Sequence, residues 1–133
     1  MISGVNHITL TVHDIDIAFN FYTTILGMKP IMKSKRSAYF QAGNIWIAIV
    51  KGESRDDERY DHIAWQVSKE DFNKIRKKII TYGSEIWKEN NTEGESLYFL
   101  DPSGNKFELH YSTLDDRVTY GKVHWGKGII WYV

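Results

Sequence analysis

The sequence predicts an α+β protein built from two tandem βαβββ modules. Two observations predict it. Each half begins with a strand-like alternation, continues with a helical apolar stripe and then returns to strands, and the two halves repeat at roughly 55 to 60 residues. We expect the first module over about residues 1–52, the second over about 59–120, and a C-terminal tail at 121–133. At 133 residues the chain is most simply one domain.

The first half begins with residues 7–12, "HITLTV", which alternate as a strand. Asp14 suits a helix N-cap, and Gly27 suits the C′ position that ends many helices. Between them, one apolar stripe is formed by Ala18, Phe21, Tyr22 and Ile25. Residues 37–43 and 44–50 then predict two strands around a short turn.

The second half follows the same order. Residues 62–67, "HIAWQV", predict a strand, and Ser68 with Asp71 resembles a capping box at the start of a helix. The helix stripe consists of Phe72, Ile75 and Ile79, and a glycine closes it. Residues 84–88 are a candidate strand, and residues 96–111 predict a hairpin with a Pro-Ser-Gly turn.

The repeat gives meaning to a carboxylate in the middle of that hydrophobic hairpin. His7 and His62 lie at equivalent places on the first strand of each half. Matching "NIWIAIV" to "NKFELHY" places Glu108 where the first half has Ile47. Pseudosymmetric sheets would bring two imidazoles and one carboxylate together, with an apolar fourth position. Three protein ligands with open positions are typical of a catalytic metal site.

Taken singly, these residues have ordinary explanations, because a strand histidine or glutamate usually faces solvent. Only the repeat relation favours the metal site. His13, His110 and His124 have no comparable partners, and we expect them to be surface or incidental residues.

Composition excludes several classes of function. Seventeen basic and seventeen acidic residues balance, so bulk charge gives no case for binding nucleic acid or an anionic membrane. The absence of cysteine excludes disulfides, thiolate metal ligands and a cysteine nucleophile. No signal-peptide pattern and no apolar run near the ~18 residues of a membrane span occurs. The default expectation is a soluble cytoplasmic protein.

The duplication, the "NHIT" opening, the "DHIA" second strand and the "FELH" strand resemble the vicinal oxygen chelate superfamily. That group includes glyoxalase I, bleomycin-resistance proteins and extradiol dioxygenases. The segment "WKENNTEGESLYFLDPSGNKFEL", followed by "TLDDR", is similar to the manganese-dependent thiol transferases of fosfomycin resistance. The resemblance spans about residues 1–118. It implies a single vicinal-oxygen-chelate domain whose modules form a curved mixed sheet and pair across a homodimer.

The resemblance also implies site residues and cofactors. The implied Mn²⁺ ligands are His7, His62 and Glu108. The implied fosfomycin-binding residues are Thr9, Trp46, Tyr60, Lys88, Ser96, Tyr98 and Arg117. Thr9, Tyr39 and Arg117 are the implied catalytic residues, with Tyr39 toward the thiol channel. An activating K⁺ would be bound by Asn90, Thr92, Gly94 and Ser96. In the homodimer, His7 of one chain would complete a site with His62 and Glu108 of the other.

Fosfomycin and a small thiol are therefore the expected partners, and glutathione is the favoured thiol. Hydrolase relatives carry a glutamate base near the place where this chain has Asn44, and bacillithiol-using relatives commonly carry a cysteine where it has Thr9. The basic segment at Lys33, Lys35 and Arg36 departs from the glutathione-using pattern and leaves bacillithiol or cysteine open. A bleomycin-resistance-like binding protein would not need the metal triad. A glyoxalase would need a fourth ligand, and Ile47 cannot supply one.

Overall fold

The structure is a computed structural model that describes residues 1, 3–53, 60–90 and 96–133. The first module comprises β1 (His7–Val12), α1 (Ile15–Asn20), the π-helical turn η1 (Phe21–Ile25), β2 (Lys29–Lys33), β3 (Ser37–Ala42) and β4 (Ile45–Lys51). The second comprises β5 (Ile63–Gln66), α2 (Lys69–Tyr82), β6 (Ile86–Lys88), β7 (Ser96–Leu100) and β8 (Lys106–His110). A last helix, α3 (Leu114–His124), follows. The α+β class and the tandem modules are confirmed. Among the described residues, no helix is both long and apolar enough to cross a membrane.

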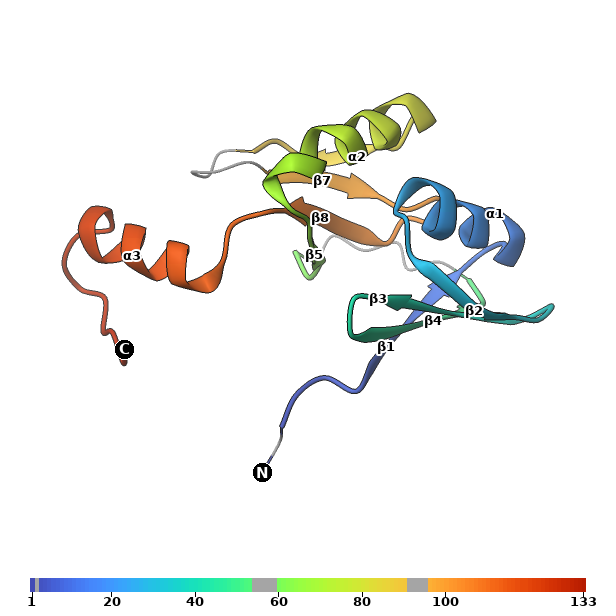
Figure 1. Cartoon of the computed structure of the whole chain (residues 1–133), viewed down its shortest axis with the longest axis horizontal. Coiled ribbons are helices and arrows are strands. Elements are labelled where there is room, and N and C mark those ends of the chain that lie inside the picture. The colour runs from blue at the N-terminus through green and yellow to red at the C-terminus, as the bar shows by residue number, and fades with distance from the viewer. Residues whose placement is uncertain (2, 54–59, 91–95) are drawn as a thin grey trace.

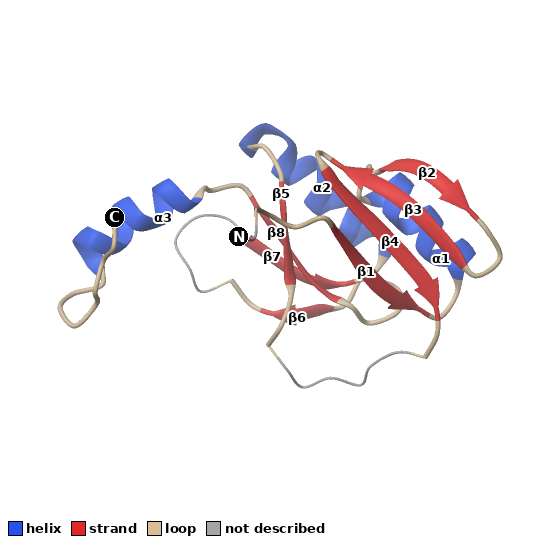
Figure 2. Ribbon diagram, turned by 90° about the horizontal axis from the view of Figure 1, so that it is seen from below, coloured by secondary structure: helices blue, strands red, loops and turns tan. Residues whose placement is uncertain are grey.

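Each module forms its own four-stranded mixed sheet, in the order β1-β4-β3-β2 and β5-β8-β7-β6 (Figure 2). In each, the first strand pairs in parallel with the fourth and the other pairs are antiparallel. The helices α1 and α2 lie side by side over the strands, whereas α3 extends away from the body of the molecule (Figure 1). The first strand of each module is therefore an edge strand.

One aromatic cluster joins the two modules. The ring of Tyr22, fully buried in η1, lies 5.3 Å from Phe40 of the first sheet and 6.0 Å from Phe107 of the second. Phe21 lies 6.4 Å from Phe99 in the second sheet. The helical segment of the first module thus contributes Phe21 and Tyr22 to the core of the second, which explains why its stripe is aromatic.

The strand register corrects the alignment of the two halves by one residue. Ile8 lies opposite Ile47, and Ile63 lies opposite Phe107. Because Ile8 and Ile63 each follow the equivalent histidine of their module, Phe107 is the counterpart of Ile47. Both are fully buried on the core face. The counterpart of Glu108 is therefore Ala48, not Ile47. The Gly-Asn pairs in the two turns favoured the wrong offset, but the hydrogen-bonded ladder decides which residues are equivalent. A methyl group cannot ligate a metal either, so the fourth position remains without a protein ligand.

Two elements lie outside the patterns that sequence reading relied on. The strand β2, largely exposed apart from Met32, has no clear apolar alternation. The helix α3 begins with a capping box between Thr113 and Asp116, and it crosses residue 121, where the tail was expected to start.

A buried carboxylate holds the β7–β8 turn against the first module. Asp101, only 4% exposed, accepts hydrogen bonds from the Tyr22 hydroxyl (2.8 Å) and from the backbone N–H groups of Ser103 (2.9 Å) and Asn105 (2.8 Å). The Asn105 side chain donates both to Asp101 (2.8 Å) and to the Thr11 carbonyl (3.0 Å). Burial raises the pKa of Tyr22 well above its usual value, and the nearby Asp101 carboxylate raises it further.

This raised pKa predicts alkaline sensitivity of the fold. The phenol stays protonated in the folded chain, whereas the unfolded phenol ionises at about pH 10. Its contribution to stability is complete below pH 10 and falls by up to about 1.4 kcal/mol per pH unit above it, until the raised pKa is reached. We expect the Tyr22→Phe variant to be about 1–2 kcal/mol less stable at pH 7, and this difference to shrink between pH 10 and 11. Urea unfolding of the wild type and the variant at pH 10 and pH 11 measures this difference. A difference that stays constant with pH would contradict a raised pKa for Tyr22.

Candidate active site

One polar pocket of about 380 Å³ lies between the second sheet and the start of α3. The polar residues of its lining include Tyr60, His62, Tyr98, Glu108, His110 and Arg117. Strand alternation places Glu108 here, because its neighbours Phe107 and Leu109 face the core. Glu108 therefore lies on the face of β8 opposite the core.

A row of facing residues crosses the second sheet at this level. It runs from Lys88 on β6 through Tyr98 on β7 and Glu108 on β8 to Ala64 on β5. The equivalent row of the first sheet consists of Met32, Tyr39, Ala48 and Thr9. The ionic groups of the row thus belong to the second module alone.

The imidazole of His62 and the carboxylate of Glu108 meet at the pocket. His62 Nε2 lies 3.0 Å from Glu108 Oε1, and His62 Nδ1 lies 2.9 Å from the Tyr60 carbonyl oxygen. A carbonyl only accepts hydrogen bonds, so Nδ1 must carry a proton. Nε2 then either donates to Glu108 as part of an imidazolium or offers its lone pair beside the carboxylate. The second arrangement is the usual one for a metal-binding histidine, whose far nitrogen is held by a carbonyl.

The second oxygen of Glu108 is held by a chain of hydroxyl and imidazole groups. Ser96 Oγ donates to Glu108 Oε2 at 2.8 Å. Because the one hydroxyl proton is used there, Ser96 accepts from His110 Nδ1, which lies 2.6 Å away. His110 Nε2 in turn contacts the Ser112 hydroxyl. The prediction that His110 is a surface or incidental residue is therefore wrong, because both of its ring nitrogens contact hydroxyl groups. The missed signal was the hairpin register, which places it opposite Ser96.

Two cations flank this carboxylate. Lys88 Nζ donates to the Tyr60 hydroxyl at 2.5 Å and lies 4.7 Å and 4.8 Å from the ring centroids of Tyr60 and Tyr98. The hydrogen bond to Tyr60 raises the pKa of Lys88, so the ammonium persists at neutral pH. Arg117 lines the same pocket from α3. Arg117 therefore lines the pocket directly, whereas Lys88 contacts two of its lining residues, Tyr60 and Tyr98.

The remaining predicted site residues form a separate group on the first sheet. Trp46, which is 40% exposed, lies between His7 and Tyr39, with ring centroids 4.4 Å and 5.2 Å away. Thr9 is exposed on the same strand as His7. None of these residues lines the pocket, and within the described ranges no group of three or more His, Cys, Asp or Glu could hold a metal. One chain therefore gathers His62 and Glu108 but does not bring His7 to them.

The predicted potassium loop is described only at its ends. Asn90 is exposed after β6, and Ser96 is buried at the start of β7. Thr92 and Gly94 lie outside the described residues. In the basic segment, Lys33 Nζ lies 2.5 Å from an Asp16 carboxylate oxygen, which offsets one of its charges.

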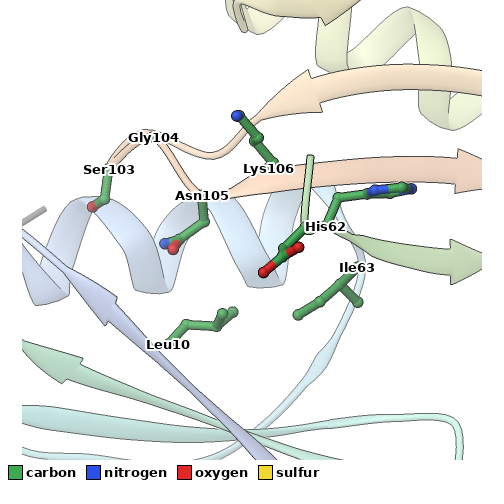
Figure 3. Close-up of a pocket in the computed structure, with 8 residues that line it drawn as sticks. Leu10, His62, Ile63, Ser103, Gly104, Asn105 and Lys106 are labelled. Carbon is green, nitrogen blue, oxygen red and sulfur yellow. The ribbon is translucent and has the colours of Figure 1, made fainter. Parts of the chain in front are cut away.

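A second, smaller cavity of about 240 Å³ lies between the modules, between Leu10 of β1 and the β7–β8 turn (Figure 3). Its polar lining includes Ser103 and Asn105, which belong to the Asp101 network. The imidazole of His62 points away from this cavity (Figure 3). The histidine thus separates the two spaces, and only the larger one holds the Glu108 carboxylate.

Comparison with known proteins identifies the family. The sequence model of the Glyoxalase/Bleomycin resistance protein/Dioxygenase superfamily matches residues 4–109. The chain belongs to this superfamily. It is 35% identical to glutathione transferase FosA of Serratia marcescens over 123 residues, covering 89% of this chain and 87% of that protein. It is 37% identical to metallothiol transferase FosB of Staphylococcus haemolyticus over 132 residues, covering 92% and 93%.

Among solved structures, the fold matches that of a mutant of the fosfomycin resistance protein FosX from Listeria monocytogenes. The TM-score is 0.83 at 35% sequence identity, covering 90% of this chain and 98% of that one. That protein was crystallised with Mn(II) and 1S,2S-dihydroxypropylphosphonic acid. The relatives of this chain are thus fosfomycin resistance enzymes that differ in their chemistry, and the resemblance to this group is confirmed.

Proposed function

We propose that this chain inactivates fosfomycin as a Mn²⁺-dependent thiol transferase, with glutathione as the favoured thiol and the cytoplasm as its location. The observation that carries the proposal is the meeting of His62 and Glu108 in a pocket flanked by Lys88 and Arg117. An imidazole and a carboxylate are suited to a divalent metal, and two cations are suited to a phosphonate. The names of the relatives supply the substrate class.

The donor set fits Mn²⁺. His62 and Glu108 would hold it, and both are oriented by hydrogen bonds on the side away from each other. When bound, the metal supplies Lewis-acid stabilisation of the alkoxide that develops as the epoxide opens. His7 of a second chain would be the third ligand.

Residues of this chain would bind and orient the substrate. The Lys88 ammonium and the Arg117 guanidinium would neutralise the phosphonate, because Arg117 can form a two-point contact with its oxygens. On β7, Tyr98 lies opposite Glu108 and lines the pocket, and the Ser96 hydroxyl donates to Glu108. Both hydroxyls would take part in binding the substrate. Thr9, Tyr39 and Trp46 of the other chain would close the pocket, with Tyr39 and Thr9 toward the epoxide and the thiol.

The reaction is a substitution at carbon. The thiolate sulfur forms a bond to the carbon next to phosphorus, the C–O bond of the epoxide breaks, and the resulting alkoxide takes up a proton. The nucleophile comes from outside the chain, which has no cysteine. No covalent enzyme intermediate is required. A K⁺ bound by the 90–96 loop would add positive charge near the phosphonate.

A shared site requires a homodimer, and the sheet edges support one. Both β1 and β5 are edge strands, with one hydrogen-bonded neighbour each in the sheet order. Exposed edges are sites for pairing with another chain. His7 lies on β1 and His62 immediately precedes β5, so a partner chain seated along these edges would bring the two imidazoles together.

Epoxide hydration is the second candidate reaction, because a solved structure similar to this chain, that of the FosX mutant, contains the diol 1S,2S-dihydroxypropylphosphonic acid. Against it, Asn44 stands near the position of the hydrolase base and cannot accept a proton at neutral pH. Thr9 favours glutathione over bacillithiol. The pairing of Lys33 with Asp16 weakens the basic segment as a site for the carboxylates of a thiol.

Product analysis tests the reaction directly. The Mn²⁺-loaded protein is incubated with fosfomycin together with one nucleophile at a time: glutathione, bacillithiol, cysteine or water alone. Phosphorus NMR follows the formation of product. We expect the glutathione adduct to form fastest, by at least about tenfold, since substrates of one site differ in transition-state binding. A diol formed without thiol would assign the hydrolase reaction instead, and no product with any nucleophile would reject both.

Mixing two inactive variants tests the shared site. His7→Ala and Glu108→Gln each disable both sites of their own homodimer. If each site is shared between chains, a mixed dimer has two different sites. One carries both substitutions, and the other is fully wild-type. We expect a refolded equimolar mixture to recover about a quarter of wild-type activity, since random pairing makes half the dimers mixed. If each site were built within one chain, the mixture would stay inactive.

The hydrogen bonds of His110 predict an effect on metal affinity. His110→Ala leaves the Ser96 hydroxyl without its donor and so loosens Glu108. We expect Mn²⁺ affinity to fall by about 10- to 100-fold, the usual effect of losing a group that orients a ligand. His110→Asn, whose amide N–H can replace Nδ1–H, should retain affinity within about threefold of wild type.

Isothermal titration with Mn²⁺ measures both variants. His124→Ala is the matched control, because His124 contacts only Tyr120 among the contacts described for it. If His110→Ala bound Mn²⁺ with wild-type affinity, Ser96 would hold Glu108 without the help of His110. Wild-type affinity in Glu108→Gln would refute the ligand assignment itself.

A further inference from the structure

The C-terminal residues fold back onto α3 and place two tryptophans together. Gly126 and Gly128 have φ values of 77° and 94°, in the left-handed region that glycine adopts without strain. They reverse the chain after α3, so that Trp131 returns to stack on Trp125. The two ring centroids are 5.9 Å apart with an interplanar angle of 20°. Lys122 Nζ donates to the Val133 carbonyl at 2.6 Å, which holds the returning end.

A glycine inside α3 makes room for both indoles. Gly121 is the buried residue of this helix. A Cβ there would lie 2.6 Å and 2.8 Å from two atoms of the Trp125 ring, and 2.8 Å from an atom of the Trp131 ring. Glycine destabilises a helix interior relative to alanine. Its presence here is explained by the seating of the two rings, which alanine would push away.

The same helix face carries Arg117. Residues 117, 121 and 125 are spaced by four and so lie above one another along α3. The guanidinium carbon of Arg117 lies 5.3 Å from the centroid of the Trp125 ring. Arg117 also lines the pocket that contains Glu108. One arginine thus connects the tryptophan pair to the candidate active site.

We propose that Trp125, seated on Gly121 and backed by Trp131, is a positioning residue that holds Arg117 toward the pocket for binding a phosphonate. The inference rests on the proposed function, since it assigns Arg117 to the anion. A long arginine side chain is mobile by itself, and contact with an aromatic face restricts it while leaving its N–H edges for in-plane hydrogen bonds. The tail after α3 is therefore part of the substrate-binding apparatus.

Methylphosphonate tests the inference without requiring turnover. It carries the phosphonate and lacks the epoxide, and its binding to the Mn²⁺-loaded protein is measured by isothermal titration. We expect Trp125→Leu to weaken binding by about 5- to 10-fold, and Trp125→Phe to stay within about twofold of wild type because it keeps an aromatic face. Tyr132→Ala, at a tail residue that is 90% exposed, is the control and should match wild type.

Gly121→Ala provides a second variant that is not expected to unfold the helix, because alanine is the stronger helix former. It should weaken methylphosphonate binding as Trp125→Leu does, with unchanged helix content by circular dichroism. In the metal-free protein, the Arg117 Nε–H resonance, assigned by its absence in Arg117→Lys, should shift in both variants. The shift is expected because the ring-current contribution of the Trp125 indole is removed in Trp125→Leu and altered in Gly121→Ala.

The outcomes separate this inference from the proposed function. Weakened binding and a shifted Arg117 resonance support it, and they do so even if phosphorus NMR shows no fosfomycin adduct. Wild-type affinity in both Trp125→Leu and Gly121→Ala overturns it. Failure of the wild-type protein to bind methylphosphonate, or equal weakening by Tyr132→Ala, also overturns it.

Discussion

The Asp101 carboxylate is the constraint on which the rest of the structure depends. It closes the β7–β8 turn through two backbone N–H groups, and it receives the Tyr22 hydroxyl from the first module. Asn105 extends the same network to β1. A hairpin whose turn is fixed in this way has one register, and a slip of one residue would exchange its two faces. The register sets Tyr98 opposite Glu108 and Ser96 opposite His110, so the turn decides which side chains meet at the pocket.

The duplication explains why the ionic groups are unevenly divided. Equivalent rows in the two sheets carry Lys88 and Glu108 in one module and Met32 and Ala48 in the other. The first module contributes aromatic side chains instead, with Trp46 between His7 and Tyr39. Burying a carboxylate is costly without partners, and the second module has collected those partners around Glu108. At this level of the sheets, the second module thus presents charged side chains and the first presents aromatic ones.

Periodicity predicted the fold because both modules obey it strongly. The helical stripe that includes Phe21 and Tyr22 and the alternation around Glu108 are visible in the sequence, and the alternation predicts that Glu108 faces away from Phe107 and Leu109. The strand β2 escaped because its residues are mostly exposed and show no alternation. The alignment of the two halves was wrong by one residue because it matched the Gly-Asn pairs of the two turns, whereas the strand register defines a different equivalence. The role of His110 depended on the hairpin register, which a list of residue types does not contain. Its partner Ser96 lies fourteen residues away.

Two hydrogen bonds orient the central groups of the pocket, and each lies on the side of its group that faces away from the other. The Tyr60 carbonyl holds Nδ1 of His62, and the Ser96 hydroxyl holds Oε2 of Glu108. Each hydrogen bond fixes the orientation of its group and leaves one atom, Nε2 or Oε1, aimed at the other. Two electron-pair donors at this distance require a positive charge between them, either a proton or a metal cation. These two hydrogen bonds therefore fix the pair of atoms between which a proton or a metal cation would lie.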